Sequence, residues 1–180
     1  RGLGDVYKRQ LSGGTPKGIE LYATGDIADL SAYGVGTANN GGGTDGSEFS
    51  LSGSATAGDY IYVVASDPGD LFTSFFGGSA TFTSGALGIN GDDAIELFSL
   101  AGGTPSVIDT FGDINVDGNG EAWEYLDGWA YRTGGTAGAF NVSDWSFSGA
   151  NAWDGETTNA GATSVMPIGT YSDTSEPSEP

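Results

Sequence analysis

The sequence predicts an all-β fold, either a sandwich or a barrel, that includes one short helix. Many short apolar runs are separated by turns rich in Gly, Asn and Asp, and this spacing is typical of short strands joined by tight connections. Glycine is abundant, at 33 of 180 residues, yet hydrophobic residues reach 37% and aromatic residues 12%. The chain therefore has enough apolar side chains to build a core and is not expected to be disordered.

The expected strands follow one another along the chain, and turn residues bound each of them. The clearest is YIYVV at 60–64, an unbroken apolar run of the kind that is buried in a sheet. Residues 39–46 are mostly Gly and Asn and are expected to form a loop, while NGDD at 90–93 predicts a hairpin-type turn. The other expected strands lie at 19–22, 26–36, 48–51, 80–83, 87–89, 94–98, 107–111, 123–131 and 145–147.

One helix is expected, at 71–76. Apolar side chains at 71, 72, 75 and 76 recur at helical spacing. The turn sequence DPGD comes directly before them, so that Asp67 or Asp70 would cap the helix. The glycine pair at 77–78 would end it.

A short internal similarity links two of the expected strands. GIELYATG at 18–25 and AIELFSLAGG at 94–103 each contain Ile-Glu-Leu, then an aromatic residue and a Gly turn. Two strands in equivalent positions of a sandwich would explain the likeness. Eight residues are too few to establish a true repeat.

The two ends of the chain are expected to lie outside the folded domain. Residues 1–10 contain DVYKRQ, which is typical of a translated transposase adapter used in DNA library preparation, so we interpret them as foreign. The natural N-terminus, with any signal peptide and first strand, is then expected to be missing. Residues 11–171 form one domain. Residues 172–180, which are acidic and rich in Pro, form a linker to something further along.

The charge of the chain is one-sided, with 24 acidic residues against 5 basic ones and a net charge of −19. Such a charge repels phosphate backbones, so we expect no direct binding to nucleic acid. The sequence has no cysteine, which excludes disulfides and thiolate metal sites. It has no histidine either, which excludes a Ser-His-Asp triad and the usual zinc sites. No run approaches twenty apolar residues, so neither a transmembrane helix nor a membrane partner is expected.

The acidic loop between the strands expected at 107–111 and 123–131 is a candidate calcium site. It fits the pattern D-x-[DN]-x-[DN]-G-x₅-E, the loop of an EF-hand, with Gly118 at the sharp turn. Calcium takes six to eight oxygen ligands, which this loop is rich in. Strand-like flanks and Gly120 at a position that is usually apolar argue against a helix-loop-helix EF-hand, and the alternative is an ordinary acidic turn. The candidate ligands are Asp113, Asn115, Asp117, Asn119, Glu121 and Glu124.

Aromatic residues gather in the second half of the chain. They could form a stacking platform for sugars or bases, but in a glycine-rich chain with few Leu and Ile we expect most of them to fill the core. The aromatic residues concerned are Trp123, Tyr125, Trp129, Tyr131, Trp145 and Trp153.

The remaining charged residues suggest structural roles. Arg132 is expected to form a structural ion pair with a nearby acid. Nothing in the spacing of Asp59 and Glu96 supports acid–base catalysis.

Five segments follow one another along the chain in a particular order and spacing: KGIELYATGDIADLSAYGV, AGDYIYVVAS, NGDDAIELF, VIDTFGDINVDGNGEAWEYLDGWAYR and WSFSGANAWDGETTNA. Together they resemble the lamin-tail domain in its bacterial extracellular form. The resemblance covers roughly residues 17–171, and it implies an immunoglobulin-like β-sandwich. The chain departs from the family at its start, where adapter-like sequence replaces the usual first strand, which would leave one sheet edge open.

The resemblance implies a secreted, non-catalytic accessory or targeting module. In bacteria such modules commonly sit in large secreted proteins, many of which carry a nuclease of the endonuclease/exonuclease/phosphatase class further along. The expected partners are then downstream domains of the same chain. The alternative is a cell-surface adhesion or carbohydrate-binding module that is stabilised by calcium and binds an extracellular polymer or surface glycan. An enzyme in its own right is the third interpretation, and no motif calls for one.

Overall fold

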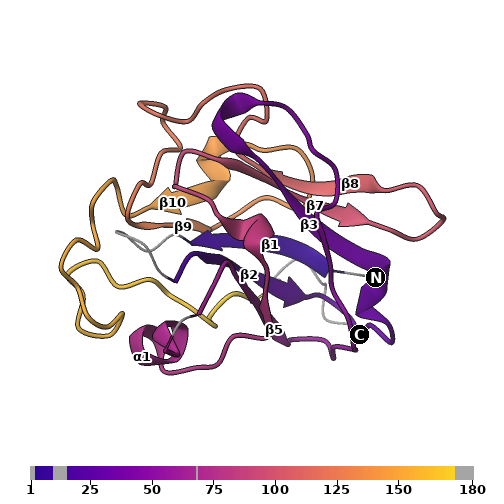
Figure 1. Cartoon of the computed structure of the whole chain (residues 1–180), viewed down its shortest axis with the longest axis horizontal. Helices are drawn as coiled ribbons and strands as arrows, with labels where there is room; N and C mark the ends of the chain where they lie inside the picture. The colour runs from indigo at the N-terminus through magenta and orange to yellow at the C-terminus, as the bar shows by residue number, and fades with distance from the viewer. Residues whose placement is uncertain (1–2, 10–15, 68, 173–180) are drawn as a thin grey trace, which may run out of the picture.

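The computed structural model of the chain describes residues 3–9, 16–67 and 69–172. Within these residues the secondary structure is mostly β, with one short α-helix, so the all-β prediction is confirmed (Figure 1). The strands are β1 (Leu3–Arg9), β2 (Gly18–Ala23), β3 (Tyr33–Ala38), β4 (Phe49–Ser50), β5 (Tyr60–Val64), β6 (Phe82–Thr83), β7 (Ala94–Ser99), β8 (Ser106–Phe111), β9 (Trp129–Arg132) and β10 (Trp145–Phe147), and the helix is α1 (Leu71–Phe76).

The strands form two sheets in the part of the chain that is described. Six strands make up the first, in the order β10-β9-β1-β2-β5-β6, and four make up the second, in the order β4-β3-β7-β8. Neighbouring strands are antiparallel, except β5 and β6, which are parallel. In Figure 1, β3, β7 and β8 of the four-stranded sheet lie above β1, β2 and β5 of the six-stranded sheet.

The hydrophobic core lies between the two sheets. Ile19 and Leu21 of β2 pack in one cluster with Ile95 and Leu97 of β7, because alternate side chains of a strand point to the same face. A second cluster joins Phe111 to aromatic residues that include Trp145 of β10. The similar Ile-Glu-Leu segments thus supply the same kind of core residues from opposite sheets, which agrees with the expected equivalence of the two strands.

The other face of the six-stranded sheet is also covered. The helix α1 and the C-terminal segment, residues 149–171, lie on the side of this sheet that faces away from the four-stranded sheet (Figure 1). Trp153 and Met166 of the C-terminal segment form a third cluster with Phe75 of α1 and Trp129 of β9. The backbone N–H of Asn159 donates to the carbonyl of Phe75 over 2.8 Å, which fixes the segment to the helix.

The helix begins and ends close to where the sequence predicts. Asp67 provides the cap, since its carboxylate accepts a 2.7 Å hydrogen bond from the N–H of Phe72. Asp70 occupies the position before the helix with φ of 56°, but its side chain makes no capping bond. Gly77 ends the helix with φ of 77°, a conformation that glycine adopts at little cost.

Three expected strands differ from the structure. In the one expected at 26–36, residues 30–32 form a 3₁₀ turn and β3 begins only at Tyr33. Residues 85–87 form a 3₁₀ turn, because the hydroxyl of Ser84 caps the N–H of Ala86, and the strand expected at 87–89 is absent from the described chain. The strand expected at 123–131 begins only at Trp129. Tyr125 lies before it in a loop, and its N–H donates to the carbonyl of Gly91 over 3.0 Å instead of joining a ladder.

Residues 3–9, which belong to the segment interpreted as foreign, form β1 between β2 and β9. A ladder is built from backbone N–H and C=O groups, so this position accepts an extended segment whatever its origin. With β1 in place, β2 is not an edge strand of the sheet. The linker expected at 172–180 lies outside the described residues from residue 173 on.

No helix in the described ranges is long and apolar enough to cross a membrane. The α-helix of the described chain, α1, has only 6 residues.

Candidate functional site

The acidic loop, residues 112–128 between β8 and β9, is held by backbone hydrogen bonds to two neighbouring loops. The N–H of Gly43 donates to the carbonyl of Ile114 over 2.8 Å, and the N–H of Gly118 donates to the carbonyl of Asp92 over 2.9 Å. These bonds come from segments far apart in the sequence. The path of the acidic loop is therefore set by tertiary contacts and not by its own pattern of acids.

Asp93 connects the two neighbouring loops to each other. Its side chain is 1% exposed, and its two carboxylate oxygens accept hydrogen bonds from the N–H groups of Asn40, at 2.9 Å, and Asn90, at 2.8 Å. A buried carboxylate whose two oxygens both accept backbone N–H groups has the hydrogen-bond partners that its burial requires. Asp93 is thus a structural residue of its turn, in keeping with its expected role.

Trp123 occupies the space inside the acidic loop. Its side chain is 5% exposed, and its ring lies edge-on to Phe111 with centroids 5.8 Å apart. Gly118 was expected to take the sharp turn of a calcium loop, but it is Gly120 that has a positive φ, of 80°. Gly118 is needed for space, since a Cβ there would lie 2.5 Å from the ring of Trp123.

The candidate calcium ligands mostly serve the loop's own backbone. Asp113 accepts a hydrogen bond from the N–H of Asn115 at 2.9 Å, and Asp117 accepts one from Asn119 at 3.0 Å, so that each closes an Asx turn. Glu124 accepts a bond from the N–H of a neighbouring loop residue at 3.0 Å. Glu124 is half-buried, and the other five candidates, Asp113, Asn115, Asp117, Asn119 and Glu121, are exposed.

These six residues do not form a metal cage in the structure. Among the described residues, no three acidic side chains come together closely enough to hold a metal ion. Calcium prefers six to eight oxygens around one point, and the observed turns direct the carboxylates toward their own amides. Calcium binding by this loop would require it to rearrange, and it stays a prediction for solution measurement.

The acids at this end of the molecule do influence one another. The pKa of Asp92 is raised, first by its burial and then by the negative charge of Asp93, with smaller contributions from Asp117 and Glu124. One oxygen of Asp92 is enclosed and makes no hydrogen bond within the described chain. The pKa of Tyr125 is also raised, by burial first and then by Asp93 and Asp92. The result is a region of negative potential at the base of the loop.

The ion pair expected for Arg132 is confirmed, and Asp109 is its partner. The guanidinium group is bidentate, with Nη2 at 2.7 and 2.8 Å from the two carboxylate oxygens. The two side chains are 3% and 0% exposed. Because Asp109 belongs to β8 and Arg132 to β9, the pair ties the two sheets together. The ring of Trp145 lies 4.6 Å from the guanidinium carbon.

The aromatic residues are largely core residues, as expected. Trp123, Tyr125, Trp145 and Trp153 are buried, while Trp129 and Tyr131 are half-buried. The indole N–H groups of Trp129 and Trp153 both donate to the carbonyl of Ser164, at 3.2 and 2.7 Å. These rings therefore hold the C-terminal segment against the sheet.

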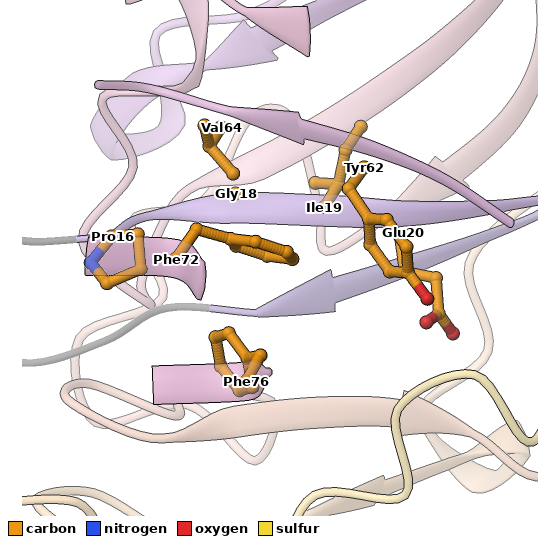
Figure 2. Close-up of a pocket in the computed structure, with 8 residues that line it drawn as sticks. All are labelled: Pro16, Gly18, Ile19, Glu20, Tyr62, Val64, Phe72 and Phe76. Carbon is orange, nitrogen blue, oxygen red and sulfur yellow. The ribbon is translucent and has the colours of Figure 1, made fainter. Parts of the chain in front are cut away.

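A cavity beneath α1 is too small for a ligand. Figure 2 shows that Phe72 and Phe76 of the helix close it over β2, with Glu20 and Tyr62 at one end. Its volume is about 10 Å³, which corresponds to one water molecule at most. It is a small gap left where the helix packs on the sheet.

A second cavity, which no sequence motif indicates, lies beside the acidic loop. It has a volume of about 270 Å³ and is lined by Glu96, Thr110, Gly112, Asp113, Ile114, Ala139 and Phe140. Asp59, considered earlier as a partner of Glu96, is not among these residues and is exposed. The signal in the sequence is the Ile-Glu-Leu segment, in which a charged side chain stands between core residues of a strand.

Comparison of the chain with protein-family models, curated proteins and solved structures finds no match.

Proposed function

We propose that this chain is a non-catalytic, immunoglobulin-like β-sandwich module of the lamin-tail type, which serves as an accessory or targeting domain in a larger secreted bacterial protein. The proposed parent protein is an extracellular nuclease of the endonuclease/exonuclease/phosphatase class. The module would position or dock the remainder of that protein.

The proposal rests on where the fold places its charged and aromatic side chains. Arginine often binds anionic substrates, but Arg132 forms a buried ion pair with Asp109. The tryptophans that could stack on bases or sugars pack between the sheets or under the C-terminal segment. The side chains best suited to chemistry thus support a rigid scaffold, and scaffold-like behaviour is what an accessory module needs.

Two further features agree with this proposal. Two mainly antiparallel sheets facing each other over a common core are the arrangement that the lamin-tail resemblance implies. The net charge of −19 keeps such a module soluble and repels nucleic acid. A nuclease would then bind its substrate through another domain.

The proposal is tested by reading the contiguous DNA on both sides of the coding fragment. A nuclease domain downstream of the acidic, Pro-rich segment is the expected result. Further β-domains, repeats or a surface anchor in that place would replace the nuclease association by the adhesion interpretation.

The non-catalytic part of the proposal has its own measurement. The purified chain is incubated with single-stranded and double-stranded DNA in the presence of Mg²⁺ or Ca²⁺, and the products are separated on a gel. No cleavage is expected. Cleavage that copurifies with the chain, and that a variant of one of its own acids abolishes, would contradict the proposal.

A further inference from the structure

The two similar strands, β2 and β7, each place a buried glutamate on the outer face of a sheet. Ile95 and Leu97 of β7 point into the core, so Glu96 between them points to the opposite face. Glu20 holds the same position on β2, between Ile19 and Leu21. The two glutamates are 1% and 3% exposed, Glu20 and Glu96 respectively, and charged side chains are seldom buried so deeply without partners.

Glu20 has a partner that the chain itself supplies. Its Oε2 accepts a hydrogen bond of 2.8 Å from the N–H of Gly169 in the C-terminal segment. That segment covers the outer face of the six-stranded sheet, as described above. One oxygen of the Glu20 carboxylate is therefore paired with a donor that arrives with the covering chain.

Glu96 has no such donor. Within the described residues its carboxylate forms neither a hydrogen bond nor an ion pair. Glu96 instead lines the 270 Å³ cavity, together with Asp113 and Thr110. Ile114 and Phe140 add apolar surface to the same cavity. We call this cavity the Glu96 pocket.

We propose that the Glu96 pocket binds an alkylammonium group, whose charge pairs with Glu96 and Asp113 and whose methylene groups lie against Ile114 and Phe140. A buried carboxylate without a partner favours a cation that donates hydrogen bonds. A volume just below the usual range of about 300–1,000 Å³ for ligand pockets suits one short chain. The same chemistry is offered by a free amine and by a lysine side chain of a partner protein.

A hard metal ion fits the pocket less well. Only two carboxylates line it, and no described group of three acids could hold a metal. Calcium needs more oxygens than two side chains provide, and the apolar wall offers it nothing. The proposal is independent of the accessory role proposed above, because it rests on Glu96 and its surroundings alone.

The experiment is a titration of the full chain with n-butylammonium, followed by NMR shifts or by calorimetry. The neutral analogue butan-1-ol, which has the same number of non-hydrogen atoms, tests whether the charge is required. Nα-acetyl-lysine methylamide tests whether the pocket admits a lysine side chain attached to a backbone, and so separates the two sources. The variant Glu96→Gln keeps the shape of the side chain and removes its charge. Glu121→Gln removes one exposed acid from the neighbouring loop and is the matched control.

Saturable binding of n-butylammonium to the wild-type chain and to Glu121→Gln is expected. The dissociation constant should rise by about tenfold or more in Glu96→Gln, as for the loss of one charge-assisted hydrogen bond. No binding to the wild-type chain, equal affinity in Glu96→Gln, or equal affinity for butan-1-ol would overturn the proposal. Displacement of the amine by equimolar Ca²⁺ would also overturn it, in favour of a metal site.

Discussion

Replacing Arg132 by methionine should cause one of the largest losses of stability available to a single substitution in this protein. Methionine retains much of the length and apolar character of the side chain. It removes the two contacts to Asp109 at 2.7 and 2.8 Å and the hydrogen bond from Nη1 to the carbonyl of Thr136 at 3.0 Å. The carboxylate of Asp109, which is 0% exposed, would lose the positive charge of Arg132.

Breaking a buried ion pair by removing one partner costs about 3–5 kcal/mol of unfolding free energy. Asp109 would still accept hydrogen bonds from the N–H groups of Gly138 and Thr110, both at 3.0 Å. These donors place the expected loss near the lower end, at about 3 kcal/mol. A typical domain has about 5–15 kcal/mol in all, so the loss would be a large share of the total.

The measurement is equilibrium unfolding in urea, followed by circular dichroism, for the wild-type chain and for Arg132→Met. Lys17→Met is the control, because Lys17 is a cation whose hydrogen bond to Asn90 is exposed, and its loss should cost about 1 kcal/mol or less. The double variant Arg132→Met/Asp109→Leu should be destabilised by less than the sum of the two single changes. A loss below about 1 kcal/mol for Arg132→Met would refute the claim that this pair ties the sheets together.

Three further predictions concern the acidic loop. Gly118→Ala should lower the free energy of unfolding by about 1–3 kcal/mol, since its Cβ would lie 2.5 Å from the ring of Trp123. Gly134→Ala is the control, because a Cβ at Gly134 meets no atom within 4 Å, and it should leave the urea midpoint almost unchanged. Because burial and nearby acids raise the pKa of Asp92, the folded state holds this proton more tightly than the unfolded state, and stability falls as pH rises through the raised pKa. Asp92→Asn should therefore raise the melting temperature at pH 7, with a smaller gain below the ordinary pKa of a carboxyl group, and an equal gain at both pH values would show that charge is not the cause. If the loop at 113–124 rearranges to bind calcium, millimolar calcium should raise the melting temperature relative to a chelator, and an unchanged temperature would remove the loop as a calcium site.

Several features could be predicted from sequence because they depend on local patterns. The run at 60–64 coincides with β5, and the helical spacing at 71–76 coincides with α1, since apolar periodicity and turn residues act over a few positions. An ion pair between Arg132 and some acidic residue could be expected because the chain has few bases and many acids. Its partner could not, since Asp109 is brought near only when the two sheets pack together.

The acidic loop shows where local reasoning fails. Its spacing matches a calcium motif, but a motif states which oxygens are present and not where they point. The position of the loop is decided by backbone bonds from the loops at 39–43 and 90–93 and by the bulk of Trp123. These contacts leave Asp113 and Asp117 to cap their own turns.

The sequence by itself determined the all-β class, the helix and the place of most aromatic residues in the core, because hydrophobic alternation and turn chemistry are properties of neighbouring residues. Only the tertiary structure decided the different surroundings of Glu20 and Glu96, two glutamates in nearly identical segments. One lies under the C-terminal segment and receives its N–H, and the other lines a cavity beside the acidic loop. The physical reason is that a strand's pattern fixes the face to which a side chain points, while the chain that packs on that face decides whether its charge is satisfied.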